Sequence, residues 1–154
     1  MFEQYREDRM NQGFVAGLIG VLPEMTYTLT LYQFQIIKLR YLDYAAWMIF
    51  HHAPQNWFQT IIAQFIVFIF CGFLGIAFSF AIKKISSRNS RVKGALFGLF
   101  NWFCIHAFVT LFQIKGLYPV GFATSVLHLV GGLLWGAIMS MVFSFLNRKY
   151  PVKD

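Results

Sequence analysis

Four long apolar segments, separated by short polar connections, constrain the fold of this 154-residue chain more than any other feature. Hydrophobic residues make up 58% of the sequence and charged residues 12%, whereas soluble globular domains have roughly 45–50% and about 25%. A soluble fold of this length would leave too much of that apolar surface exposed to water. The composition therefore predicts a protein that folds in a lipid bilayer.

Each apolar segment is long enough to cross a membrane as a helix. A span needs about 20 mostly apolar residues, and a helix satisfies its own backbone polar groups without water. In the first segment, Pro23 frees the carbonyl of Ile19 and is expected to bend the helix. This segment lacks a small-residue cleavage pattern, so it is expected to remain as an anchor. The expected spans are, in chain order, Gly13–Phe34, Trp57–Ile82, Lys93–Ile114 and Gly121–Leu146.

The positions of the lysines and arginines predict which side of the membrane each connection faces. Ten of the 13 lie in the N-terminal tail, the second connection and the C-terminal tail, and three lie in the other two connections. Positively charged loops stay on the cytoplasmic side, so both termini and the second connection are expected there. The net charge of +7 then reflects topology, and no nucleic acid partner is expected. Four aromatic residues near the outer edge fit an interfacial belt: Tyr41, Tyr44, Trp47 and Trp57.

The first outer connection is long enough to hold an element of its own. Its middle, residues 39–50, has apolar side chains at helical spacing but is too short to cross the membrane. We expect an interfacial or re-entrant helix that lies against the bundle. Arg40 and Asp43 are three residues apart in it and are expected to form an ion pair, while His51 and His52 after it are expected to be exposed.

The two halves of the chain resemble each other, which indicates an internal duplication. The first span has Gly13-x-x-x-Gly17 and then TLYQF, and the third has Gly94-x-x-x-Gly98 and then TLFQI, with nearly the same separation. The second and fourth spans share F-x-T and FSF, and these words place Gln64 opposite His128. Each half is thus expected to be one helical hairpin, with the two copies related by an axis along the membrane normal.

Glycines recur at four-residue spacing in three of the spans. Such small-x-x-x-small patterns let helix backbones approach closely. We expect packing seams within the bundle, with a homodimer face as the alternative. The residues are Gly13, Gly17, Gly94, Gly98, Gly132 and Gly136.

The spans also contain a few strongly polar side chains, and ionisable groups inside a membrane are candidates for a functional site. They are Glu24, Gln64, His106 and His128, one in each span. At about 1.5 Å of rise per residue, in a hydrocarbon core about 30 Å thick, all four lie at nearly the same depth. They are therefore candidates for one intramembrane polar cluster.

Three interpretations of this cluster are open. Hydrogen bonds between helices are the favoured one, a proton-linked or cation-linked role is the second, and a metal site with two histidines and a carboxylate is the weakest. The spacing contains no local ligand signature such as H-E-x-x-H. No metal, cofactor, catalytic residue or enzyme activity is expected, and Cys71 and Cys104 are expected to be small packing residues.

The second connection, Lys83–Lys93, is strongly basic and contains the sequence SSRNSR. It is expected to lie near anionic lipid headgroups, which attract basic segments beside a span. A homodimer or an unknown membrane protein remains possible as a further partner.

Two sequence stretches resemble known families of small bacterial membrane proteins of unknown function. GFVAGLIG followed by LRYLDYAAWMIF is similar to the YqhR-like proteins of Gram-positive bacteria. The second half, with KGALFGLF, GLYP and SVLHLVGGLLWG, resembles the YagU-like inner-membrane proteins. The resemblance implies a four-span protein of the bacterial plasma membrane and supplies no catalytic residue.

The sequence thus predicts an all-α fold, a polytopic membrane four-helix bundle made of two tandem helical hairpins, with a short interfacial helix in the first outer loop. All 154 residues are expected to form a single transmembrane domain. The expected role is that of a non-enzymatic structural or accessory protein that acts through lipid or protein contacts. The alternative is a small transporter or a proton- or cation-linked conduit that uses the Glu/His cluster.

Overall fold

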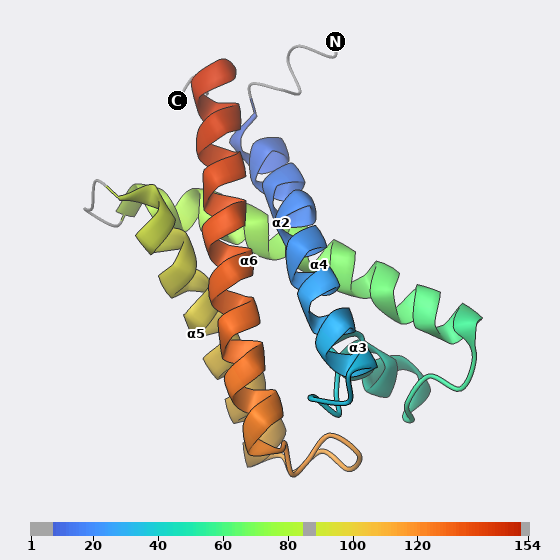
Figure 1. Cartoon of the computed structure of the whole chain (residues 1–154). Helices are drawn as coiled ribbons and strands as arrows, with labels where there is room; N and C mark the ends of the chain where they lie inside the picture. The colour runs from blue at the N-terminus through green and yellow to red at the C-terminus, as the bar shows by residue number, and fades with distance from the viewer. Residues whose placement is uncertain (1–7, 85–88, 152–154) are drawn as a thin grey trace.

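The computed structural model describes residues 8–84 and 89–151, and in this part of the chain the only regular elements are helices (Figure 1). Side chains are described for all of these residues except 83 and 84. The all-α prediction is confirmed. The elements are α2 (Arg9–Gln33), α3 (Tyr41–Phe50), α4 (Trp57–Lys84), α5 (Ser90–Leu111) and α6 (Phe122–Lys149).

Four of these helices, α2, α4, α5 and α6, are long and apolar enough to cross a membrane. Two of them begin earlier than the apolar runs predicted, because polar residues cap them. The Asp8 side chain accepts a hydrogen bond from the backbone N–H of Met10 at the start of α2, and Asn89 caps α5 in the same way. At the other end, α5 stops at Leu111, three residues before the predicted boundary, and Gln113 then turns the chain with a φ of 45°.

The spans pair as the two predicted hairpins, α2 with α4 and α5 with α6. Helices α2 and α6 also pack side by side in the middle of the bundle, while α4 crosses behind them at a steep angle (Figure 1). The buried apolar core at these contacts includes Ala16, Val21, Phe78, Trp135 and Met139. Because α4 barely touches α5, the two hairpins are not arranged symmetrically about each other.

The predicted glycine seams lie inside the bundle, within each hairpin. A methyl group on Gly13 would lie 2.6 Å from the carbonyl oxygen of Gly75 and also against Ser79. A methyl group on Gly17 would meet the backbone of Cys71. Since real Cβ atoms do not come this close to a carbonyl, α2 and α4 can pack at this distance only with glycine at these two positions of α2.

The same seam occurs in the second hairpin. A methyl group on Gly94 would meet the carbonyl of Gly136 and the side chain of Ser140, and one on Gly98 would meet the carbonyl of Gly132. The two hairpins therefore share one packing pattern, in which two glycines of the first helix face a small-x-x-x-Gly-x-x-x-Ser face of the second. This repeated contact supports the internal duplication.

The packing shows a different register for the duplication than the sequence words suggested. The seams match Gly75 with Gly136 and Ser79 with Ser140, a register that places Gln64 opposite Ser125, whereas the words placed it opposite His128. The difference is about one helical turn. Because a helix slipped by one turn keeps the same side chains on the same face, the short apolar words fit nearly as well in the wrong register.

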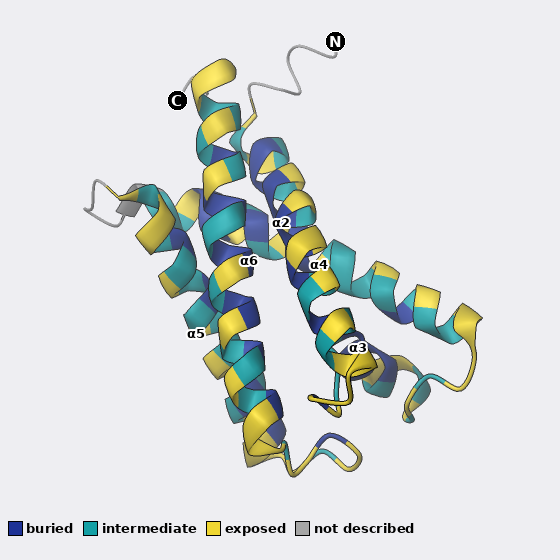
Figure 2. Cartoon of the chain, viewed as in Figure 1, coloured by how far each residue is buried: buried dark blue, intermediate teal, exposed yellow. Residues whose placement is uncertain are grey.

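Exposed residues lie along the outward faces of the spans (Figure 2), and many of them are large and apolar, whereas the glycines of the seams are buried. Large exposed side chains occur on every span, among them Val15, Phe65, Phe73, Phe100 and Phe145. This is the reverse of a soluble bundle and is typical of a protein whose solvent is lipid. The chain is therefore an integral membrane protein by the length and composition of its helices.

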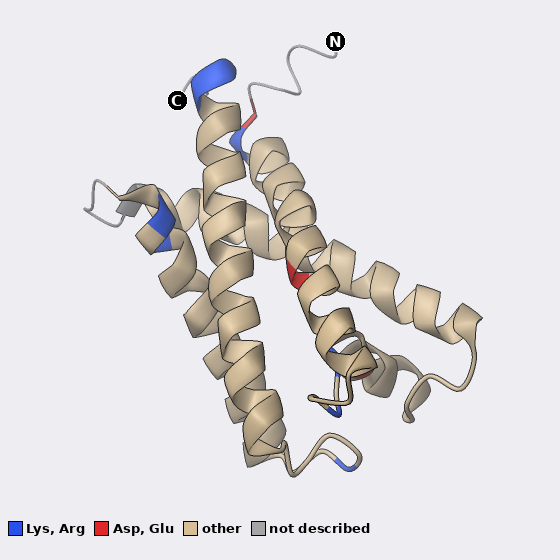
Figure 3. Cartoon of the chain, in the orientation of Figure 1, with Lys and Arg blue, Asp and Glu red and all other residues tan. Residues whose placement is uncertain are grey.

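Hydrogen bonds gather three helix ends at one end of the bundle, which we call the terminal end. Arg9 Nη1 donates to the carbonyl of Ser79 at 2.8 Å, and Gln12 Nε2 donates to the carbonyl of Tyr150 at 2.7 Å. These contacts join the start of α2 to the ends of α4 and α6. Basic residues lie here and at the opposite end, which we call the α3 end (Figure 3).

Residues 85–88 of the basic second connection, Lys83–Lys93, lie outside the described residues, and its place at the headgroups stays a prediction. Its described part is tied to the bundle. Ser90 Oγ lies 2.7 Å from both Ser140 Oγ and Ser144 Oγ, and Lys93 Nζ donates to the carbonyl of Ile82 at 3.4 Å. The serine contacts hold the start of α5 against α6, and the Lys93 bond joins it to the end of α4, all at the terminal end.

Candidate functional site

The connection between α2 and α4, which contains α3, forms one wall of the candidate site. Arg40 precedes α3, and the Asp43 carboxylate accepts hydrogen bonds from Arg40 N, Nε and Nη2 at 2.7, 3.2 and 2.8 Å. This confirms the predicted pair, which also caps the helix. Leu42–Ala46 of α3 are buried, so α3 is packed into the bundle.

Helix α3 ends at Phe50, and the next residue, His51, takes a left-handed conformation with φ 60°. His51 is exposed, as predicted, but His52 is half-buried, and its Nδ1 lies 2.7 Å from the carbonyl oxygen of Ala53. The two histidines lie after α3, and the histidines of the candidate site come from other helices.

Two histidines from adjacent spans meet beside α3. The rings of His106 on α5 and His128 on α6 have centroids 5.8 Å apart and are nearly perpendicular, at 77°. His128 is fully buried and His106 is 9% exposed. These two predicted site residues therefore lie in contact in the interior and do not face lipid.

Two tyrosines of α3 complete this group. The Tyr41 ring stacks on the His128 ring with centroids 4.4 Å apart, and its hydroxyl donates to the His128 carbonyl at 2.9 Å. The Tyr44 ring lies 6.2 Å from His106 and 5.9 Å from His128. The position of these tyrosines near a span end by itself predicts only an aromatic belt. Their spacing of three residues puts both on one face of α3, and this was the signal that could have predicted a shared contact.

One nitrogen of each histidine ring is already used. His106 Nδ1 lies 3.1 Å from the carbonyl oxygen of Trp102, and His128 Nε2 lies 3.0 Å from that of Leu39. Because a carbonyl only accepts, these nitrogens carry the N–H in the neutral rings. The other nitrogens, His106 Nε2 and His128 Nδ1, are buried and make no hydrogen bond to the described residues. Each is a buried acceptor without a donor in the described part of the chain.

Glu24 lies on the other side of Tyr41, where α2 packs against α6. It is 4% exposed, and its Oε1 makes no hydrogen bond to the described residues. The nearest part of α6 is Gly131, where a methyl group would lie 3.4 Å from Oε1. Gly131 is three residues beyond His128 and hence on the same side of α6. An ionised carboxylate at such a place is costly unless a proton, a cation or a donor reaches it.

A small cavity lies between Glu24 and α3. Its volume is about 10 Å³, and Glu24, Thr28, Arg40, Tyr41 and Gln64 all line it. This is about the space needed for the centre of one water molecule. Glu24 and Gln64 thus share the cavity, His106 and His128 share a ring contact, and Tyr41 belongs to both. The structure brings the four predicted polar residues together as two pairs that one residue of α3 connects.

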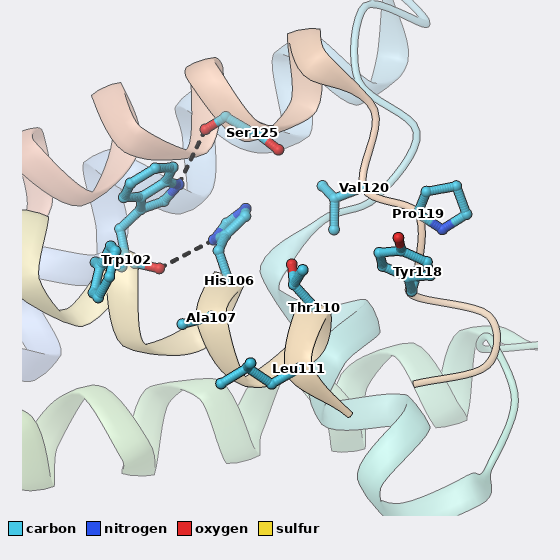
Figure 4. Close-up of a pocket in the computed structure, with 10 residues that line it drawn as sticks. Trp102, His106, Ala107, Thr110, Leu111, Tyr118, Pro119, Val120 and Ser125 are labelled. Carbon is cyan, nitrogen blue, oxygen red and sulfur yellow. Dashed lines mark hydrogen bonds between the residues drawn. The ribbon is translucent and has the colours of Figure 1, made fainter. Parts of the chain in front are cut away.

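A larger groove opens on the far side of His106, between α5, the start of α6 and the connection that joins them (Figure 4). Its volume is about 710 Å³. Trp102, His106 and Thr110 line it from α5, and Tyr118 and Ser125 line it from the connection and α6. The Trp102 indole N–H donates to the Ser125 carbonyl at 3.0 Å, which fixes its inner wall. This groove was not predicted, because no single segment of sequence forms it.

In residues 8–84 and 89–151, no group of three His, Cys, Asp or Glu side chains is placed to hold a metal ion. The histidine pair therefore has no third metal ligand in this part of the chain. Cys71 is buried and Cys104 is exposed, and neither belongs to a disulfide. In comparisons with protein-family models, curated proteins and solved structures, nothing matches the chain.

Proposed function

We propose that this integral membrane protein is a non-enzymatic structural or accessory protein that acts through contacts with lipids and other membrane proteins. The observation that carries the proposal is the outward surface of the spans, which presents large apolar and aromatic side chains such as Phe65, Phe100 and Phe145. Several interior polar groups join separate segments of the chain. Tyr41 and Leu39 hold the outer connection to His128, for example, and Trp102 holds α5 to the start of α6.

We also propose that the protein lies in the cytoplasmic membrane of a bacterium, with both termini and the α4–α5 connection in the cytoplasm. Ten of the 13 lysines and arginines belong to these segments, and positive charge near span ends favours the cytoplasmic side. The resemblance to YqhR-like and YagU-like proteins agrees with this location, and we propose membership of that group of small membrane proteins on the same ground.

Reconstitution of the purified protein into vesicles tests the accessory role. We expect the passive flux of protons and alkali cations to equal that of vesicles without protein. We also expect a photo-crosslinker at Phe100 or Phe65 to give adducts with lipid or with one recurring membrane protein. A protein-dependent flux that is lost in Glu24→Gln would overturn the accessory role in favour of the second candidate.

The second candidate function is a proton-linked one, and a specific observation favours it. Glu24 Oε1, His106 Nε2 and His128 Nδ1 are buried, and none of them makes a hydrogen bond to the described residues. Structural hydrogen-bonding residues normally satisfy such atoms. Three such atoms in adjacent groups support a site that takes up and releases a proton.

A further inference from the structure

We propose that Glu24 exchanges its proton with the α3 end of the bundle only, through the groove beside His106, the His106–His128 pair and the cavity that Tyr41 and Glu24 share. This inference rests on the second candidate function, because it requires Glu24 to be a proton-exchanging group. It adds a direction of access and two groups, Tyr41 and the groove, that the sequence did not reveal.

The path begins at the groove. His106 lines its wall, and the bond from Nδ1 to the Trp102 carbonyl fixes the ring (Figure 4). Nε2 is then the nitrogen that can take a proton. Thr110 and Ser125 line the same groove, so it offers polar groups as well as aromatic rings to entering water. A volume of about 710 Å³ holds many water molecules.

The next step is between the two rings. His128 lies in contact with His106, and the bond from its Nε2 to the Leu39 carbonyl leaves Nδ1 to accept a proton. The two free nitrogens make no hydrogen bond to each other, so a water carries one proton from protonated His106 to His128, and His106 returns to the neutral form. His128 does not line the small cavity, but Tyr41, which stacks on the His128 ring, does. One proton then passes from His128 beside Tyr41 to the Glu24 carboxylate. Each transfer moves one proton, and the last yields a neutral carboxylic acid and a neutral imidazole.

The opposite direction is filled with apolar side chains. From Glu24 toward the terminal end, α2 meets α6 at Gly20, where an added methyl would lie 3.0 Å from the Cβ of Met139. Val21, Phe78 and Trp135 form the buried cluster at this level. Beyond them the backbones of the glycine seams are in contact. Glu24 therefore meets polar groups on the side of the cavity beside Tyr41.

The charged and titratable groups around Glu24 come from every neighbouring element. Tyr27 lies on α2 itself, Cys71 on α4, and Tyr41 in α3. Arg40 lines the same cavity, but the Asp43 carboxylate holds its guanidinium. His128 lies on the same side of α6 as Gly131, which contacts Glu24. Of these groups, Tyr41 and His128 belong to ring contacts that continue through His106 to the groove.

Side-specific chemical labelling of the intact protein tests this direction. The protein is placed in vesicles in one orientation and treated with dicyclohexylcarbodiimide, which reacts with protonated carboxyl groups in membranes. The adduct at Glu24 is measured by mass spectrometry of its peptide. The pH is changed on one side while the other side is held alkaline. We expect labelling to rise on acidification of the α3 side and to stay constant on acidification of the terminal side.

Variants then test the route. After a pH jump on the α3 side, the protonation rate of Glu24, followed by its infrared carbonyl band, is expected to fall about tenfold or more in His106→Phe and in His106→Gln. Phe100→Leu changes an exposed aromatic residue of α5 outside the groove without removing a proton acceptor, so its rate is expected to equal the wild-type rate. Wild-type rates in both His106 variants would overturn the route.

Two further outcomes distinguish a failure of one-sided access from a failure of the proton-linked function. Labelling that follows the terminal side, or both sides equally, would overturn one-sided access and leave the proton-linked function standing. Absence of labelling at every pH, in folded wild-type protein, would overturn the proton-linked function and this inference with it. The wild-type labelling experiment needs no variant, so a variant that fails to fold does not prevent the decision.

Discussion

At the residue scale, glycine is required where the carbonyl of a neighbouring helix occupies the place of a side chain. An added methyl on Gly98 meets the carbonyl of Gly132, whereas one on Gly121 meets nothing within 4 Å. We predict that Gly98→Ala lowers the free energy of unfolding by about 1–3 kcal/mol through overpacking, and that Gly121→Ala has little effect. Thermal unfolding in detergent measures both, and equal melting temperatures would contradict the seam.

Tyr41 is a residue whose single hydroxyl connects α3 to α6. In Tyr41→Phe the ring can still stack on His128, but the His128 carbonyl loses the donor that now lies at 2.9 Å. We predict a loss of about 0.5–1.5 kcal/mol of stability, measured by unfolding in detergent. Tyr118→Phe, at an exposed residue of the groove, is the matched control and is expected to leave the stability unchanged.

The residue types of the site could be predicted from sequence, but their connection could not. Glu24, Gln64, His106 and His128 stand out as polar side chains in apolar helices. The rotation of each span about its axis decides whether the two histidines touch. It also decides whether Glu24 shares a cavity with Gln64. Tyr41 was missed because a tyrosine near a helix end is equally typical of a membrane interface.

At the element scale, α3 depends on the bond between its first turn and the residue before it. The Asp43 carboxylate accepts three hydrogen bonds from Arg40 and is buried. We predict that Asp43→Asn weakens these bonds and speeds hydrogen exchange of the amides of Leu42–Ala46, while exchange in α5 stays unchanged. Mass spectrometry of exchanged peptides measures this, and unchanged rates in α3 would show that packing alone holds it.

The spans themselves follow directly from the sequence, since each is an apolar run of sufficient length. Their boundaries moved by a few residues because Asp8 and Asn89 cap helices within polar sequence. The relation between α4 and α6 was less accessible. Sequence words matched Gln64 with His128, but the register of the glycine seams matches it with Ser125. Only the contacts between backbones fix that register.

At the scale of the whole molecule, the arrangement predicts which residues share a side of the membrane. Lys115 lies in the α5–α6 connection at the α3 end, and Arg148 lies near the end of α6 at the terminal end. We predict that Lys115→Cys and Arg148→Cys react with an impermeant maleimide from opposite sides, in a background in which Cys71 and Cys104 are replaced by serine. Labelling of both from one side would contradict an odd number of crossings between them.

The two hairpins of the bundle differ because their connections at the α3 end, α2–α4 and α5–α6, have different lengths. The first carries α3, whose buried face fills the flank of its hairpin, while the second runs only from Phe112 to Gly121 and leaves the groove beside His106. The two hairpins therefore differ: α3 covers the side of the first, and the groove lies on the side of the second. A small molecule would approach the paired imidazoles from the groove side alone, although both hairpins are built on the same glycine contact.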